Sequence, residues 1–245
     1  MSNRPGKSKS ASQRVREASN AGKGRNSTML WVGIVAVVVI VGVIAVLAGR
    51  SSGGSSGGGA ASPSGGTVVP NGTMDFGTIS VQGTALQPKP DTGADPAVGQ
   101  TVPTIAGVQF DGKQLDIKPD GTPKIIMVVA HWCSHCQKEV PLVQGWLDQE
   151  GMPADVELVS VATSNSSSKP NFPAADWLRR EKWSVPTIVD DKENKAGTAL
   201  GVSGFPYFIV TDGQGKVIYR TSGEKTKAEW DAMLEAARTG VAPSV

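Results

Sequence analysis

The stretch Ala130-His131-Trp132-Cys133-Ser134-His135-Cys136 decides the fold of this 245-residue chain. It follows the nearly continuous apolar run Lys124–Ala130, which is typical of a strand covered on both faces. It leads into Ser134–Gln149, where apolar residues recur at helical spacing. The pair Cys133 and Cys136 therefore lies at a strand-to-helix corner, and its spacing places both sulfurs on the first helical turn.

A cysteine at the N-terminus of a helix is favoured as the nucleophilic thiolate, because unpaired N–H groups and the helix dipole stabilise negative charge there. We expect Cys133 to be the exposed nucleophile and Cys136, one turn deeper, to be the resolving thiol. These are the only two cysteines of the chain. A loop this short gains little chain entropy from cross-linking, so redox chemistry explains the pair better than stability does.

Metal binding is the competing interpretation of the same stretch. His131, Cys133, His135 and Cys136 fall within six residues, and one corner is poorly suited to presenting four tetrahedral zinc ligands. We therefore expect no resident metal. Capture of Cu(I) by the two thiolates stays open as an alternative.

The N-terminal region is typical of a membrane anchor. Residues 1–28 are polar, carry seven basic residues and one acid, and indicate a disordered tail. Residues 29–49 then form an uncharged, mostly apolar run, long enough as a helix to cross a bilayer core of about 30 Å. That run exceeds a signal-peptide core. The basic flank predicts a cytoplasmic N-terminus and disfavours nucleic-acid binding as its role.

Composition predicts two further zones. Residues 50–97 are rich in Gly, Ser and Pro and indicate an extracytoplasmic linker. Within them, Met74–Leu86 alternates weakly and suggests a short strand. The folded domain is expected over residues 98–245, as an α/β fold with a mixed sheet. Its predicted strands are Val102–Val108, Lys124–Ala130, Val156–Ala162, Pro186–Val189, Tyr207–Thr211 and Lys216–Arg220, and its predicted helices are Ser134–Gln149, Ala174–Trp183, Lys195–Val202 and one beginning at Thr226.

Residues 98–240 resemble the thioredoxin superfamily. The resemblance rests on Trp132 and the Cys-x-x-Cys pair after an apolar strand, and on Gly204-Phe205-Pro206-Tyr207 just before a later strand. It implies that Pro206 is cis, that Phe205 offers backbone groups to a substrate, and that Trp132 packs beside the cysteines. The length between the two motifs is similar to that of the membrane-anchored TlpA/ResA-type members.

The direction of electron flow stays open at this stage. The family's buried acid in the strand before the motif is replaced by Met127, so no acid is expected there. His135 before the second cysteine resembles DsbA-type oxidants, because a histidine beside the thiolate stabilises the reduced form. The subfamily resemblance, in contrast, suggests a reductant.

The resemblance implies a protein thiol–disulfide oxidoreductase anchored in the cell membrane by a single span, with its catalytic domain extracytoplasmic. Its expected substrates are exported proteins or apocytochrome cysteines. The expected site is Cys133, Cys136, His135 and Trp132, with Phe205 and Pro206 binding substrate. We expect no cofactor besides the redox-active disulfide, a separate membrane electron-transfer partner, and no nucleic acid. The alternative function is a Cu(I) metallochaperone.

Overall fold

The computed structural model describes residues 72–244, together with Met1. The tail predicted at residues 1–28, apart from Met1, and the membrane span predicted at 29–49 lie outside these residues. Among residues 72–244, no helix combines the length and the apolar character that crossing a bilayer requires.

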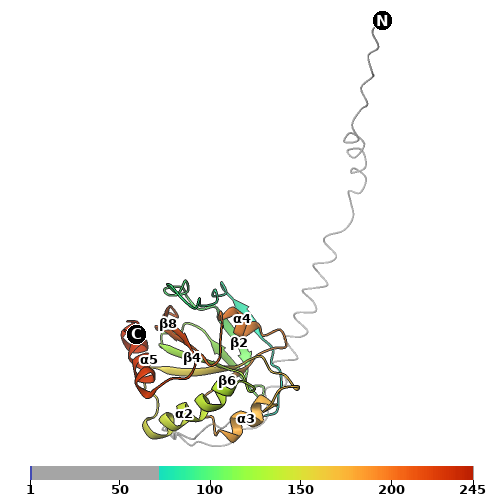
Figure 1. Ribbon diagram of the computed structural model, residues 1–245, viewed down its shortest axis with the longest axis vertical. Helices are drawn as coiled ribbons and strands as arrows, with labels where there is room; N and C mark the ends of the chain where they lie inside the picture. Colours follow the sequence, from blue (N-terminus) through green and yellow to red (C-terminus); the bar gives the residue numbers. More distant parts are fainter. Residues whose placement is uncertain (2–71, 245) are drawn as a thin grey trace, which may run out of the picture. The chain divides into compact units, whose positions relative to one another are not determined.

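A five-stranded mixed sheet forms the centre of the folded part (Figure 1). β4 pairs in parallel with β5 and antiparallel with β7, which places it in the middle of the sheet. In sheet order the strands are β6 (Thr187–Val189), β5 (Glu157–Ala162), β4 (Lys124–Val129), β7 (Tyr207–Thr211) and β8 (Val217–Ser222).

Four described helices pack on this sheet. They are α2 (Ser134–Glu150), α3 (Ala174–Arg180), α4 (Lys195–Ala199) and α5 (Lys227–Thr239). α5 begins with the predicted capping box, since the Thr226 side chain accepts from the Glu229 backbone and the Glu229 carboxylate accepts from the Thr226 backbone. It ends at Gly240, whose φ of 74° is left-handed, a conformation that glycine adopts without strain.

Two apolar cores lie on opposite faces of the sheet. Because side chains alternate along a strand, β4 sends Ile125, Met127 and Val129 to one core and Ile126 and Val128 to the other. The first core is completed by α2, α3 and α5. The second is completed by α4 and by residues upstream of β4. In Figure 1, α2 and α3 accordingly lie on one side of the sheet and α4 and β2 on the other.

The packed structure begins upstream of residue 98, where the sequence predicts the domain to start. A second, three-stranded antiparallel sheet has the order β1 (Ser80–Gln82), β2 (Thr104–Val108) and β3 (Gln114–Ile117). β1 lies within the weakly alternating segment Met74–Leu86. Ile79 and Leu86 are buried in the second core, so this part of the predicted linker belongs to the fold despite its polar composition.

A buried ion pair ties the same segment to the central sheet. The Arg220 side chain is fully buried, and its Nε donates to Asp95 Oδ2 at 2.9 Å. Its second terminal nitrogen also donates to Asp95, and Nη1 donates to the Gln87 carbonyl at 2.9 Å. The guanidinium on β8 therefore depends on two residues that the sequence assigns to the linker.

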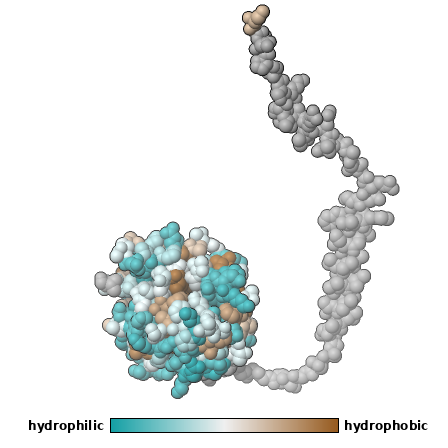
Figure 2. Space-filling view, turned by 45° about the vertical axis from the view of Figure 1, so that its right-hand side comes forward, coloured by the Kyte–Doolittle hydropathy of each residue, from teal (hydrophilic) through white to brown (hydrophobic). Residues whose placement is uncertain are grey.

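The surface of the folded part shows few large apolar side chains. Those that are exposed include Val98, Leu142 and Val241, which are far apart in the sequence. On the face in Figure 2, hydrophilic and neutral residues cover most of the surface, with apolar residues between them.

We predict that Asp95→Ala lowers the free energy of unfolding by about 3 kcal/mol, because it leaves the buried Arg220 charge uncompensated. Urea denaturation of the variant and the wild type measures this loss. Asp91→Ala is the matched control, since Asp91 is exposed in the same segment, and it is expected to change the free energy by less than about 0.5 kcal/mol. Equal effects of the two substitutions would contradict a structural role for the pair.

Candidate active site

The two cysteines lie where the central strand passes into α2. β4 ends at Val129, and Cys133 is the N-cap residue of α2. Cys133 is partly exposed, whereas Cys136, one turn along the helix, is completely buried. Both are free thiols in the structure. This is the arrangement that the sequence predicts for an accessible nucleophile and a shielded partner.

The loop before β7 faces the first cysteine. The Phe205–Pro206 peptide bond is cis, as the resemblance implies. The Cys133 thiol donates to the Phe205 carbonyl at 3.7 Å, although the two residues are 72 positions apart. The Gly223 N–H donates to the Pro206 carbonyl at 2.9 Å and so helps to fix the cis-proline loop in place. The Phe205 backbone is thus within contact distance of the reactive sulfur.

Trp132 lies between the cysteine and a neighbouring loop. Its indole N–H donates to the Ser164 carbonyl at 2.8 Å. Its ring meets the ring of Phe205 edge to face, with the centroids 5.9 Å apart, and the Lys169 ammonium lies 5.9 Å from its centroid. Trp132 and Phe205, both partly exposed, therefore form an apolar border beside Cys133.

His131 is fully occupied by structural hydrogen bonds. Its Nδ1 lies 2.7 Å from the Pro170 carbonyl, and its Nε2 accepts from the Ser166 N–H at 3.1 Å. This pair of partners fixes the neutral tautomer with the proton on Nδ1. Burial lowers the pKa of His131, which also favours the neutral ring. His131 thus holds the loop after β5 against the active-site corner.

His135, in contrast, lies at the surface. Its Nδ1 is 2.6 Å from Glu224 Oε1, and the Lys138 ammonium is 3.2 Å from the same oxygen. Glu224 belongs to the loop between β8 and α5, 89 residues along the chain. The sequence pattern predicts a role for His135 but gives no indication of this partner.

A buried carboxylate lies one turn beyond Cys136. Glu139 has no solvent exposure, and its two oxygens accept from the Lys225 backbone N–H at 3.2 and 3.0 Å. Burial raises the pKa of Glu139 to about 7, against a lowering by the Lys225 hydrogen bond. Burial also raises the pKa of the Cys136 thiol far above its usual value, and the charges of Cys133 and Glu139 add to this rise.

Sequence reasoning missed Glu139 because it looked for the acid in the preceding strand. That position is Met127, which is buried in the first core. The acid comes from the helix instead, at i+3 from Cys136. A signal was available, since Glu139 interrupts the apolar face formed by Cys136, Val140 and Val143, and a charged residue on a buried face demands a reason.

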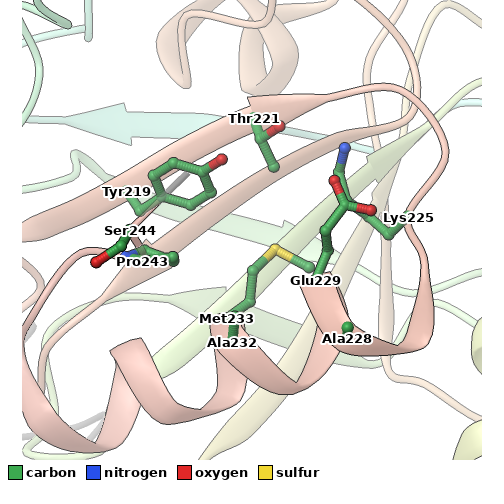
Figure 3. Close-up of a pocket in the computed structure, with 9 residues that line it drawn as sticks. All are labelled: Tyr219, Thr221, Lys225, Ala228, Glu229, Ala232, Met233, Pro243 and Ser244. Atoms are coloured by element: carbon green, nitrogen blue, oxygen red, sulfur yellow. The ribbon is translucent and has the colours of Figure 1, made fainter.

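A cavity of about 230 Å³ lies beside α5 and is separate from the cysteine pair. Figure 3 shows Met233 at its centre, Tyr219 and Pro243 at one end, and Lys225 and Glu229 at the other. Lys225 belongs to both places, because its side chain lines this cavity while its backbone N–H binds Glu139.

The fold and the site together define a class of protein. A partly exposed thiol at a helix N-terminus, a buried thiol one turn later and a cis-proline loop against the first sulfur are the features of a thioredoxin-like thiol–disulfide oxidoreductase. The Redoxin family model matches residues 97–234. Because this is more than half of the chain, the protein belongs to the Redoxin family.

Curated relatives are thiol–disulfide enzymes. The thiol:disulfide interchange protein DsbE of Pasteurella multocida is 29% identical over 142 residues, which cover 56% of this chain and 73% of that protein. The thiol-disulfide oxidoreductase ResA of Bacillus anthracis is 22% identical over 139 residues, covering 56% and 77%. The crystal structure of StoA from Bacillus subtilis is 21% identical with a TM-score of 0.46, covering 56% of this chain and 98% of that one.

We predict that Glu139 makes stability fall as pH rises. Its pKa is raised from 4.5 to about 7, so the folded state binds more protons than the unfolded state between these values. The contribution of Glu139 is therefore lost across this window, by on the order of 3 kcal/mol. Glu139→Gln keeps an acceptor for Lys225 and removes this dependence. Urea denaturation at pH 5, 6, 7 and 8 measures the effect.

The difference between variant and wild type isolates Glu139 from His131. The pKa of His131 is lowered from 6.5, so its contribution has the opposite sign and is lost as pH falls. It is common to both proteins and cancels. Glu235→Gln, at an exposed position of α5, is the control for net charge. A wild type and an E139Q variant with parallel pH profiles would contradict the raised pKa of Glu139.

Proposed function

We propose that this protein is an extracytoplasmic thiol–disulfide oxidoreductase that exchanges disulfides with exported proteins or apocytochrome cysteines through Cys133-Ser134-His135-Cys136. The observation that carries the proposal is the asymmetry of the pair. Cys133 is partly exposed at the helix N-terminus beside the Phe205 carbonyl, whereas Cys136 is buried next to an acid. Nucleophile and resolving thiol thus have different environments, as a two-step exchange requires.

The exchange can be followed in the reducing direction. The Cys133 thiolate attacks one sulfur of a substrate disulfide, and the other substrate sulfur leaves as a thiolate. Cys136 then loses its proton and attacks the Cys133 sulfur, which releases the second substrate thiolate. Two electrons have passed to the substrate, and the Cys133–Cys136 disulfide has formed. Oxidation of a substrate dithiol is the same sequence in reverse.

Glu139 is the proposed acceptor of the Cys136 proton. Burial disfavours the Cys136 thiolate strongly, so the resolving step needs a base close by. Glu139 is on the same face of α2, and its pKa of about 7 allows it to take up and release a proton near neutral pH. The proton then returns to solvent or to the leaving substrate thiolate.

The substrate is proposed to lie along the border formed by Trp132 and Phe205. An extended segment beside the cis-Pro206 loop would place its own sulfur near Cys133 and its backbone near Phe205. Both aromatic rings are partly exposed and meet edge to face, which offers an apolar contact without a charge preference. This arrangement suits substrates that differ in sequence.

The location is proposed from the N-terminal sequence. The apolar run at residues 29–49 after a basic flank supports a single span with the N-terminus in the cytoplasm. The catalytic domain would then lie outside. Neither the span nor the tail contains a cysteine, so a separate membrane partner is proposed to carry electrons to or from the pair. The disulfide itself is the only redox group that this chemistry requires.

Cu(I) binding by the same two thiolates is the competing function. His131 already has both ring nitrogens hydrogen-bonded, so His135 is the one histidine near the pair with a nitrogen left for a third ligand. Copper analysis of the reduced protein against a Cys133→Ser/Cys136→Ser variant separates the two functions. Stoichiometric Cu(I) without thiol exchange would favour the chaperone.

We predict that the two cysteines fail in different ways when each is replaced. Cys133→Ser removes the nucleophile and abolishes dithiothreitol-dependent reduction of insulin, measured by turbidity. Cys136→Ser keeps the nucleophile, so it also loses turnover but accumulates a mixed disulfide with glutathione, detected as an added mass. If Cys133→Ser formed this adduct and Cys136→Ser did not, the assigned roles would be reversed.

A further inference from the structure

One short loop contacts three parts of the redox site. It comprises Gly223, Glu224 and Lys225, between β8 and α5, and is called the 223–225 loop below. Its first residue donates its N–H to the Pro206 carbonyl, its second contacts His135, and its third donates its N–H to Glu139. The cis-proline loop, the dipeptide between the cysteines and the buried acid are thus all held by three consecutive residues.

The middle residue, Glu224, contacts the dipeptide between the two cysteines. Glu224 Oε1 is 2.6 Å from His135 Nδ1 and 3.2 Å from the Lys138 ammonium. Hydrogen bonds from His135 and Lys138 hold the pKa of Glu224 below its usual value, so it is ionised at neutral pH. The other charged groups nearby include Lys225, whose ammonium binds the Ser222 and Glu224 carbonyls, the buried Glu139, and Glu229.

We propose that Glu224 is a positioning residue for the thiol–disulfide reaction, which fixes the imidazole of His135 and places a carboxylate against it, so that the Cys133–Cys136 disulfide is a weaker oxidant than Cys-Ser-His-Cys alone would make it. This inference rests on the proposed function. It bears directly on whether the protein is an oxidant or a reductant, which the dipeptide by itself leaves open.

The charges near Cys133 determine the direction in which Glu224 shifts the thiol–disulfide equilibrium. Reduction of the disulfide adds two electrons, and the product that reacts onward carries a negative charge on the Cys133 sulfur. A positive imidazole on the same helical turn stabilises that charge and favours reduction of the pair. A carboxylate bound to the imidazole reduces the positive charge that the imidazole can present to the Cys133 sulfur. It therefore disfavours the reduced form.

Screening by solvent limits how far Glu224 can shift the thiol–disulfide equilibrium. The His135 side chain is 60% exposed and the Glu224 side chain 40% exposed, so their interaction with the cysteines is screened. We expect Glu224→Gln to increase the equilibrium constant for oxidation of glutathione by the protein about threefold to tenfold. A tenfold change corresponds to about 30 mV for a two-electron couple.

The experiment measures this constant for the full chain in detergent, equilibrated in graded glutathione buffers at pH 7. Four proteins are compared: wild type, Glu224→Gln, His135→Ala and the double variant. Glu235→Gln makes the same change in net charge at an exposed position of α5 and is the matched control. Near-ultraviolet circular dichroism confirms that each protein keeps its tertiary structure.

The proposal predicts that Glu224→Gln raises the equilibrium constant for oxidation of glutathione threefold or more when His135 is present. In the His135→Ala background, the same substitution is expected to change this constant less than twofold. Glu235→Gln is expected to change the constant less than twofold. No rise for Glu224→Gln, or the same rise with and without His135, would overturn the proposal, because the carboxylate would then not act through the imidazole. A wild-type pair that never equilibrates with glutathione would overturn the proposed function itself.

Discussion

β4 lies between two apolar cores, and its burial on both faces is the constraint on which the rest of the structure depends. Each of its six residues is buried. A shift in its register would move apolar side chains to the wrong face, so the register of β4 in the sheet is strongly constrained. The chain leaves this strand at Val129 and begins α2 a few residues later. The position of the strand therefore determines the position of the two cysteines. The Cys136 side chain is packed in the first core.

The sequence predicts the elements around this strand well, because their patterns are local. The apolar run of β4, the helical spacing after Cys133 and the capping box at Thr226 each depend on residues close together in the chain. The cysteine environments were also predictable, since a helix N-terminus and its first turn determine which thiol is exposed. The cis bond before Pro206 was predictable only through the family resemblance.

The parts that could not be predicted depend on residues far apart in the chain. Burial in the assembled core raises the pKa of Glu139, and its hydrogen-bond donor is the Lys225 backbone, 86 residues away. His135 contacts Glu224 at a similar separation. The segment upstream of residue 98 has the composition of a linker, yet Asp95 reaches a fully buried Arg220. Local composition describes what a segment can do alone, and each of these contacts exists only after the sheet has assembled.

The division of the interior by the sheet has a consequence for engineering. The core that receives Cys136 and is closed by α2, α3 and α5 is continuous with the redox corner, so repacking it alters the surroundings of the resolving thiol. The opposite core, built from α4 and the three-stranded sheet, contains neither cysteine. Phe205 packs against this second core and Tyr207 belongs to it. Thermostable forms of this protein are therefore best sought by repacking the part of the second core around α4 and the three-stranded sheet, away from these two residues.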